Sequence, residues 1–437
     1  MFKKQFFGLD YQLKPVLYMV SLLVFIQCTQ PYSTNDDAVS STLIVLSSDE
    51  MRGRQAFTKD IDRAADFIAS KFQEIGLDNF SNLKGYTQNF KLNEVGISDH
   101  SLVIDRESVE SDQFFALLNG KPIDWNNSTI EVQEIKKDDN YRARFQELSS
   151  SETNLLVFVD PSHSDIFGRY QGFYSRPTRI MDTDKSSNIV FILANRSNSF
   201  SITIEPKVEE QELANVLGII PGNRTNEFVL FSAHHDHIGI RNVVEGDSIA
   251  NGANDNASGV TAVIELAKYF KSKSKPERTL VFATFTAEEA GGYGSQYFSK
   301  QFNPDEIIAM FNIEMIGKPA VSGPNTAWVT GYERSNFGEL LSKSTEGTEY
   351  EFYADPYPQQ NLFYRSDNAT LARLGVPAHT ISTTPIDVDK DYHQVSDEFE
   401  TINISHLTNT IRAIARAAQG IVSGQDTPTR VDINLVD

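Results

Sequence analysis

The strongest constraint on the fold of this chain is a pattern in its second half. Three apolar runs, at residues 228–231, 281–285 and 307–313, are typical of buried strands. Each run is followed by residues of a type that can bind metals or transfer protons. These residues are His234 and Asp236, Glu288 and Glu289, and Glu314, respectively. Because ligands of an open parallel sheet bind outside the carboxyl ends of its strands, we expect these side chains to meet at one edge of a sheet. The sequence therefore predicts a metal site there.

The segments around these runs alternate between helix and strand. Apolar residues at helical spacing predict amphipathic helices at residues 60–75, 258–270 and 406–421, and shorter helices at 295–302, 337–342 and 368–374. Further strands are predicted at 327–330 and 378–382. Such alternation favours an α/β fold, and we predict a three-layer sandwich with a mixed, mostly parallel central sheet.

Between residues 95 and 210 the pattern changes to short apolar or alternating runs separated by turn residues. This pattern predicts a β-rich insertion at 95–210 within a main domain formed by residues 38–94 and 211–424. Asp160, Ser162 and His163 lie close together here, but triad partners normally come from separate elements, so we interpret them as a polar turn. The residues from Gln425 onward are expected to form a frayed tail.

The first 28 residues have the features of an export signal. Lys3, Lys4 and Lys14 precede an apolar run at 16–26 that is too short to span a bilayer as a helix. The run ends near Cys28, the only cysteine, which excludes an intramolecular disulfide. This arrangement resembles a bacterial lipoprotein signal, in which that cysteine carries the lipid. We therefore expect an exported lipoprotein, periplasmic or on the surface of a bacterial envelope, that meets the membrane only through Cys28.

The overall composition limits the class of partner. An apolar fraction of 40% is ample for a packed core, and a formal net charge of −20 argues against nucleic acid, because binding requires cations that neutralise phosphates. We expect peptide substrates instead.

Five residues near the predicted strand ends and turns are candidate metal ligands: His234, Asp255, Glu289, Glu314 and His393. Zinc binds histidine nitrogen and carboxylate oxygen. Two zinc ions bring four positive charges, which three carboxylates and one bridging hydroxide would balance. Glu288 then remains free to take a proton from the bound water.

Five motifs make the resemblance to a known family specific. They are His234-His235-Asp236, residues 252–259, residues 287–295, residues 312–317, and Tyr392-His393. In this order they resemble the di-zinc aminopeptidase family, which includes aminopeptidase Y, glutamate carboxypeptidases and glutaminyl cyclases. The resemblance covers about residues 41–93 and 213–423. It implies a phosphorylase/hydrolase-like zinc exopeptidase fold, with the insertion where many members carry a protease-associated domain.

The resemblance also implies a role for each residue. His234 and Glu314 would bind one zinc, Glu289 and His393 the other, and Asp255 would bridge both. Glu288 would be the general base, and Asp236 would hydrogen-bond His234 and fix its ring. The Asp255–Asn256 peptide bond would be cis, as in relatives. Many relatives carry Asp at the position of Glu314, which changes the reach of the side chain but keeps its carboxylate.

These roles imply an exported metallo-aminopeptidase that hydrolyses N-terminal residues from peptides, with a metal-bridged water and Glu288 as the base. Three alternatives stay open at this point. A glutaminyl cyclase-like relative would use a single zinc. A carboxypeptidase-like relative would need several arginines, for which Arg365 alone is thin support. A binding protein on the same fold would have a catalytically dead site.

Residues around this set receive weaker predictions. The substrate cleft is expected to include Tyr364, Arg365, Asp367 and Tyr392. The charges of residues 48–54 are interpreted as a solvated face with local ion pairs. His235 and His237 are expected to stay outside the ligand set, and His379 is interpreted as a satisfied core histidine.

Overall fold

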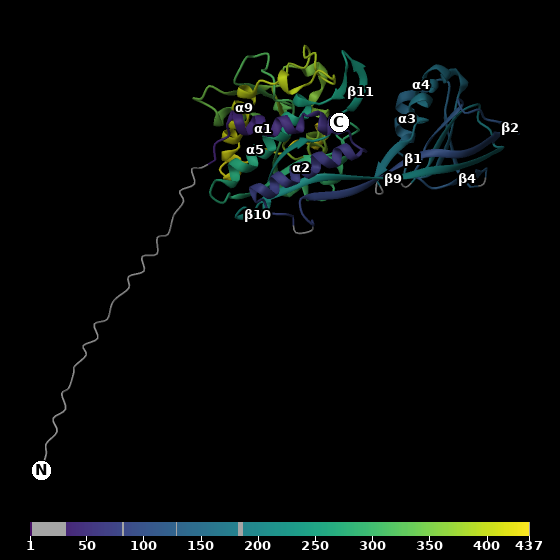
Figure 1. The fold of residues 1–437 in the computed structure, drawn as a ribbon. Coiled ribbons are helices and arrows are strands. Elements are labelled where there is room, and N and C mark those ends of the chain that lie inside the picture. The colour runs from purple at the N-terminus through teal and green to yellow at the C-terminus, as the bar shows by residue number, and fades with distance from the viewer. Residues whose placement is uncertain (2–31, 81–82, 128, 182–186, 437) are drawn as a thin grey trace.

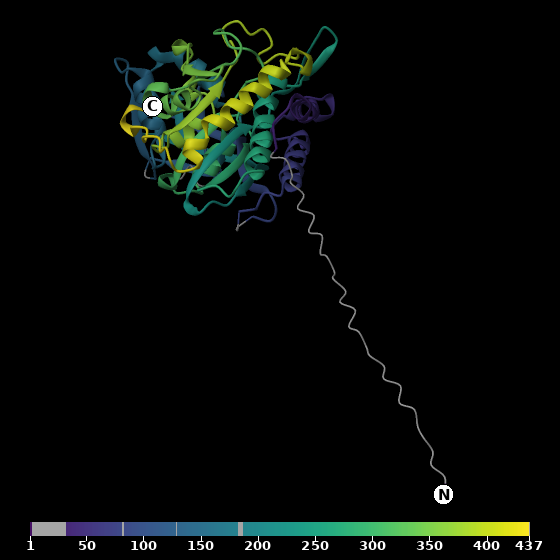
Figure 2. The same cartoon turned by 90° about the vertical axis from the view of Figure 1, so that its left-hand side faces the viewer.

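The computed structural model describes residue 1 and residues 32–80, 83–127, 129–181 and 187–436 (Figures 1 and 2). Residues 2–31 lie outside the described ranges. They include Cys28 and all of the predicted export signal except Met1, so the lipid anchor stays a prediction. None of the helices in the described ranges combines the length and the apolar character that crossing a bilayer requires.

A single large sheet organises the main body. Strand β10 (Arg224–His234) pairs in parallel with β13 (Arg278–Phe285) on one side and with β14 (Ile307–Ile313) on the other. β14 pairs in parallel with β17 (Ala378–Ser382), whereas β13 pairs antiparallel with β9 (Phe200–Ile220). The sheet continues to β15 (Thr326–Val329) and β16 (Glu351–Ala354) at one edge and to β1 (Thr87–Ile104) at the other. The mixed, mostly parallel sheet predicted from the sequence is confirmed.

Helices cover both faces of this sheet, so the body has three layers. One face carries α1 (Asp36–Leu46), α2 (Lys59–Ile75), α5 (Gly259–Lys271) and α9 (Ile404–Ala417) (Figure 1). The opposite face carries the shorter α6 (Tyr293–Ser299) and α8 (Asn368–Ala372). Because the central strands are buried on both faces, their sequences are continuous apolar runs rather than alternating patterns.

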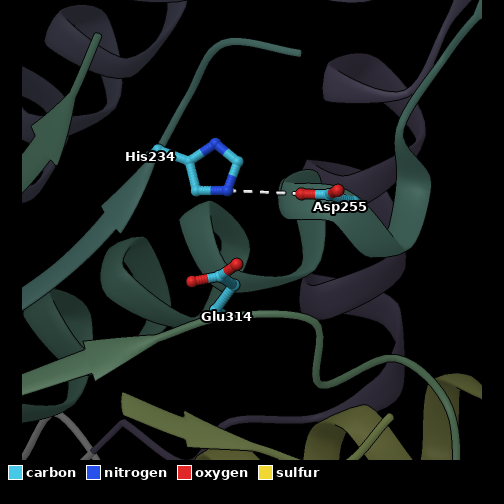
Figure 3. A group of neighbouring side chains, drawn as sticks. All are labelled: His234, Asp255 and Glu314. Carbon is cyan, nitrogen blue, oxygen red and sulfur yellow. Dashed lines mark ion pairs between the residues drawn. The ribbon is translucent and has the colours of Figure 1, made fainter. Parts of the chain in front are cut away.

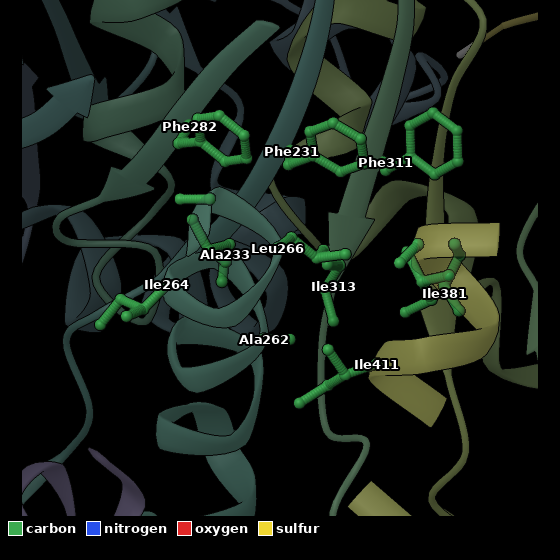
Figure 4. Packing of buried hydrophobic residues seen from close by; sticks show 14 of the residues in the cluster. Phe231, Ala233, Ala262, Ile264, Leu266, Phe282, Phe311, Ile313, Ile381 and Ile411 are labelled. Carbon is green, nitrogen blue, oxygen red and sulfur yellow. The ribbon is translucent and has the colours of Figure 1, made fainter. Parts of the chain in front are cut away.

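A row of aromatic rings joins the three central strands beside α5 (Figure 4). The ring centroid of Phe231 lies 5.5 Å from that of Phe282 and 5.0 Å from that of Phe311. All three side chains are fully buried, and burying one phenylalanine stabilises a fold by roughly 1.5–3 kcal/mol. This packing holds together the strands whose ends carry the predicted ligands.

The helix boundaries follow signals in the sequence. α2 begins after Thr58, whose side chain accepts a hydrogen bond from the Asp60 N–H, and ends at Gly76 with a φ of 76°. The closing helix predicted at 406–421 is divided into α9 and a short α10 (Gln419–Val422).

The segment between β1 and β9 forms a lobe beside the main body (Figure 1). The two strands pair over most of their length and run from the central sheet into this lobe. Its own sheet contains β3 (Phe114–Leu117), β8 (Ile189–Leu193), β6 (Leu155–Val159) and β5 (Glu131–Ile135), in that order. As predicted, the Asp160-Ser162-His163 group forms a polar turn, in which the Asp160 side chain accepts from the Ser162 N–H.

The lobe also contains two helices that the sequence pattern did not predict, α3 (Tyr141–Ser149) and α4 (Ser164–Tyr174). Their buried residues are few and mostly aromatic, and they pack against the sheet residues Phe115 and Phe191. Tertiary contacts of this kind, rather than local propensity, decide such short helices.

Two predictions about surface segments are wrong. The stretch 48–54 is not a solvated face throughout, because Arg54 is fully buried. The tail after Gln425 is not frayed either, because Val431 is buried and Arg430 Nη1 donates to the carbonyl oxygens of Pro304 and Ile307 at 3.0 Å. Residues 49–54 form 3-10 turns interrupted at Arg52 and Gly53, and the tail is largely irregular, so no periodic pattern in the sequence marks the residues that point inward.

Candidate metal centre

The predicted ligands of the first metal come together at the carboxyl edge of the central sheet (Figure 3). His234 is the last residue of β10, and Glu314 follows the last residue of β14. Asp255 lies in the irregular turn Ala253–Ser258 that leads into α5, and the Asp255–Asn256 peptide bond is cis, as the family resemblance implied. His234 and Asp255 are buried, so the arrangement is shielded from bulk water.

His234, Asp255 and Glu314 form a first group of ligand atoms that lie within 4.8 Å of one another. His234 Nε2 is 3.2 Å from Asp255 Oδ1. Zinc–ligand bonds of about 2.1 Å place neighbouring ligand atoms of a tetrahedral site roughly 3.4 Å apart. Among the described residues, His234 Nε2, Asp255 Oδ1 and Glu314 Oε2 are buried and make no hydrogen bond. Buried polar atoms of this kind are costly, and a bound cation would satisfy all three.

The other carboxylate oxygen of Asp255 faces a second group. His393 Nε2 lies 3.3 Å from Asp255 Oδ2 and 3.2 Å from Glu289 Oε2. His237 Nδ1 lies 2.9 Å from Glu289 Oε1 and 3.8 Å from Asp255 Oδ2. Asp255 therefore directs one oxygen at each group, which is the geometry that a bridging ligand needs. His237, Asp255 and Glu289 offer ligand atoms within 4.8 Å of one another, and the sequence did not predict that His237 takes part in this site.

The electrostatics of the site also favour cations. Burial raises the pKa of Glu314 to about 7, against an opposing effect of His234. Burial acts in the same direction on Asp255, but the neighbouring imidazoles of His234, His237 and His393 hold its pKa well below the usual value. Divalent cations would neutralise these crowded carboxylates, and the donor set of histidine nitrogen and carboxylate oxygen is one that zinc accepts. The residues present therefore fit a pair of zinc ions.

Asp236 holds the backbone of Glu288 and Glu289 in place. Its Oδ1 accepts from the Glu288 N–H at 3.0 Å, and its Oδ2 accepts from the Glu289 N–H at 3.2 Å. The resemblance implied instead a hydrogen bond to His234. Oδ1 lies 3.7 Å from His234 Nδ1, and the nearer acceptor is the Asp236 carbonyl oxygen at 3.2 Å. One carboxylate thus fixes both the proposed base and a neighbouring ligand.

Asp397 holds the backbone around Asp255 in a similar way, and the sequence analysis did not identify this residue. Its carboxylate accepts from the N–H of Asn254 at 2.9 Å and from the N–H of Asp255 at 2.9 Å. Burial raises the pKa of Asp397 to about 6, and the two N–H donors oppose that shift. The available signal was an acid four residues after the predicted ligand His393, in a turn-rich stretch.

Replacing Asp397 by Asn is expected to weaken zinc binding by about 10–100-fold, the usual cost of losing a group that orients a ligand. Asn keeps one acceptor oxygen but turns an NH₂ group toward a backbone N–H. Chelator competition against the purified variant measures the effect. Glu400→Gln, at an exposed position nearby, is the matched control, and equal zinc affinities of the two variants would contradict the assigned role.

Arg54 is a second residue that the sequence analysis did not identify, and its side chain stabilises the loops that carry the predicted ligands. Its guanidinium donates to the carbonyl oxygens of Leu46, His235, Asn251 and Gly252 at 2.6–3.0 Å, and to that of Asp255 at 3.4 Å. Burial lowers the pKa of Arg54 to about 10, with Asp255, Asp397, Asp236 and Glu289 opposing the shift. Arg54 therefore stays charged at neutral pH and ties the N-terminal segment to both ligand-bearing loops.

A pocket opens beside Glu314. Its lining includes two residues predicted for the cleft, Arg365 and Tyr392, together with Trp328, Leu362 and Ile386. Asp367 is buried, and its negative charge helps to raise the pKa of Glu288. Tyr364 packs against the apolar cluster beneath α8.

His379 is confirmed as a core histidine, because its ring forms hydrogen bonds with the Thr330 carbonyl at 2.8 Å and with Ser335 Oγ at 2.7 Å.

A known protein family matches the part of the chain that carries the candidate metal centre. Residues 215–418 match the family model described as Peptidase family M28. Leucine aminopeptidase 2 of Trichophyton rubrum is 26% identical over 284 residues, which cover 58% of this chain and 54% of that protein. The match therefore spans about half the length of this curated relative.

Solved structures share the fold. BSAP, a zinc aminopeptidase from Bacillus subtilis, has a TM-score of 0.55 at 17% identity, covering 90% of this chain and 97% of that chain. The aminopeptidase from Aneurinibacillus sp. strain AM-1 has a TM-score of 0.52 at 20% identity, covering 92% and 96%. The fold class predicted from the sequence is confirmed. All five predicted ligands lie within residues 215–418, the segment that matches the model of peptidase family M28.

Proposed function

We propose that the chain is an exported zinc-dependent aminopeptidase that removes N-terminal residues from peptides. The observation that carries this proposal is the position of Asp255 between two ligand groups. Its Oδ1 lies 3.2 Å from His234 Nε2, and its Oδ2 lies 3.3 Å from His393 Nε2. The match of residues 215–418 to the family M28 model and the similarity to a leucine aminopeptidase support the same activity.

His234 and Glu314 would hold one zinc ion. Glu289 and His393, whose Oε2 and Nε2 atoms lie 3.2 Å apart, would hold the other, and Asp255 would be shared between the two ions. When bound, the two ions would polarise the scissile carbonyl and lower the pKa of water toward about 7. Glu288 would take the proton from the attacking water and pass it to the leaving amine. Burial raises the pKa of Glu288 well above its usual value, with Glu314, Asp367 and Glu289 adding to the shift and His234 opposing it. A carboxylate within hydrogen-bond reach of the attacking water can both accept and return its proton.

The cavity beside Glu314 would receive the side chain of the N-terminal residue. Trp328, Leu362 and Ile386 give it a largely apolar wall, so we expect large apolar side chains to bind best. Arg365 and Tyr392 lie at the same cavity and would contact the peptide.

A panel of aminoacyl anilides tests this activity on the zinc-loaded protein. Leucyl and phenylalanyl anilides should be cleaved faster than glutamyl or lysyl anilides, and N-acetyl-leucyl anilide should not be cleaved, because the free α-amine is required. Equal rates on the acetylated and free substrates, or no cleavage of any member by protein that holds two zinc ions, would refute the proposal.

Removal of metal is expected to destabilise the protein. Buried carboxylates and imidazoles that lose their cations are left unsatisfied, and a ligand present at 100 times its Kd contributes about 2.7 kcal/mol to folding. Thermal unfolding should therefore shift to lower temperature in EDTA and return when zinc is added. An unfolding temperature that does not respond to either treatment would contradict metal binding.

We also propose that the chain is exported and lipidated at Cys28. The support is the sequence of the first 28 residues, with lysines, a short apolar run and a single cysteine. Labelling of the expressed full chain with a fatty-acid analogue should depend on Cys28 and disappear in Cys28→Ser. Labelling that persists in Cys28→Ser would show that the lipid is elsewhere.

A further inference from the structure

We propose that His237 is a positioning residue that holds Glu289 so that this carboxylate binds metal through one oxygen only. The inference rests on the proposed di-zinc function and goes beyond it. The His237 side chain is fully buried, and its Nδ1 lies 2.9 Å from Glu289 Oε1. The other oxygen, Oε2, faces His393 Nε2 at 3.2 Å. The two oxygens of Glu289 therefore have different partners, one histidine each.

The distances favour a hydrogen bond from His237 rather than a metal–nitrogen bond. A separation of 2.9 Å is the most common N–H···O distance. It is shorter than the 3.2–3.3 Å between the atom pairs placed to share a cation. His237 Nδ1 is also 3.8 Å from Asp255 Oδ2, the oxygen that the second cation would use.

The other ring nitrogen points to the same conclusion. His237 Nε2 is buried and makes no hydrogen bond within the described residues. If Nδ1 bound a cation, the ring proton would sit on Nε2 as a buried donor without a partner. A histidine that binds metal almost always donates its other N–H, so this arrangement would be unusual. If Nδ1–H donates to Glu289, Nε2 carries no proton and is a buried acceptor without a partner. A buried acceptor without a partner is less rare than a buried N–H donor without one.

The surrounding backbone leaves the ring little room to turn. The His237 N–H donates to the Arg54 carbonyl at 3.2 Å, which fixes the backbone at this position. Gly252 has a φ of 58°, and a Cβ added there would lie 2.5 Å from His237 Cδ2. Only glycine allows the ring to pack so closely against the loop that carries Asp255. The donor is thus held in place before any metal binds.

A catalytic zinc site needs one coordination position that stays open for substrate or water. A carboxylate bound through both oxygens would occupy two positions in the second zinc site, whereas one bound through Oε2 alone leaves a position for substrate or water. By engaging Oε1, His237 reserves that position. This role differs from the roles of Asp236 and Asp397, which act on backbone N–H groups rather than on a ligand side chain.

Three variants of the full chain test the inference: His237→Ala, His237→Asn and the control His235→Phe. Asn retains an N–H donor close to the position of Nδ1, but an amide nitrogen does not bind zinc. The ring of His235 is also buried, yet neither of its nitrogens makes a hydrogen bond among the described residues. Zinc affinity at each of the two sites is measured by chelator competition, and coordination number is measured from the visible spectrum after cobalt substitution.

We expect His237→Ala to weaken one of the two sites by about 10–100-fold and to alter the cobalt spectrum. His237→Asn should return both readouts toward the parent values, and His235→Phe should leave them unchanged. Loss in Asn equal to that in Ala would overturn the inference in favour of a metal–nitrogen bond, and an unchanged Ala variant would overturn any role in binding. A parent chain that binds fewer than two zinc ions would refute the proposed function itself, an outcome distinct from these.

Discussion

Replacing Glu288 by Gln is expected to lower kcat on leucyl anilide by about 10²–10⁴-fold while both zinc ions remain bound. The carboxylate of Glu288 is absent from both candidate ligand groups, so metal content should not change. Gln is nearly isosteric but cannot accept a proton from water. The backbone hydrogen bond from the Glu288 N–H to Asp236 at 3.0 Å is independent of the side chain and should persist.

The measurement combines steady-state kinetics with elemental analysis of the same preparation. Glu245→Gln, at an exposed turn, is the matched control and should retain the parent rate. If Glu288→Gln loses zinc together with activity, Glu288 is a ligand and not the base. If it keeps the parent rate, another group takes the proton.

Replacing Arg54 by Met is expected to lower the free energy of unfolding by about 3–5 kcal/mol, because several buried carbonyl oxygens lose their donor and each such loss costs about 1–3 kcal/mol. Met fills a similar volume but donates no hydrogen bonds, so the carbonyl oxygens of Leu46, Asn251 and Gly252 lose their donor. The variant also removes the positive charge that faces Asp255 and Asp397. We therefore expect weaker zinc binding as well as lower stability.

Denaturant unfolding of the zinc-loaded protein measures this loss. The control is Arg52→Met, two residues away, where the side chain is 49% exposed and makes a surface ion pair with Asp60 at 3.4 Å. Exposed pairs of this kind contribute about 0–1 kcal/mol. If the two variants had equal stability, Arg54 would not brace the metal centre.

Much of the fold could be predicted because its signals are local. The apolar runs of β10, β13 and β14 and the spacing of apolar residues in α2 and α9 are visible in the sequence, and the structure places these elements where predicted. The helices α3 and α4 could not be predicted in the same way. Their aromatic residues gain their stability from contacts with strands far away in the chain, so no local pattern marks them.

The sequence by itself determined the chemistry of the site: His234, Asp255, Glu288, Glu289, Glu314 and His393 stand at strand ends or in polar turns and match family motifs. Only the tertiary structure decided which other residues fix these side chains and their loops in position. Arg54, Asp397 and His237 act on carbonyl oxygens, backbone N–H groups and one carboxylate oxygen contributed by distant segments. Such contacts have no periodicity or spacing in sequence, because they depend on how loops approach one another once the sheet has formed.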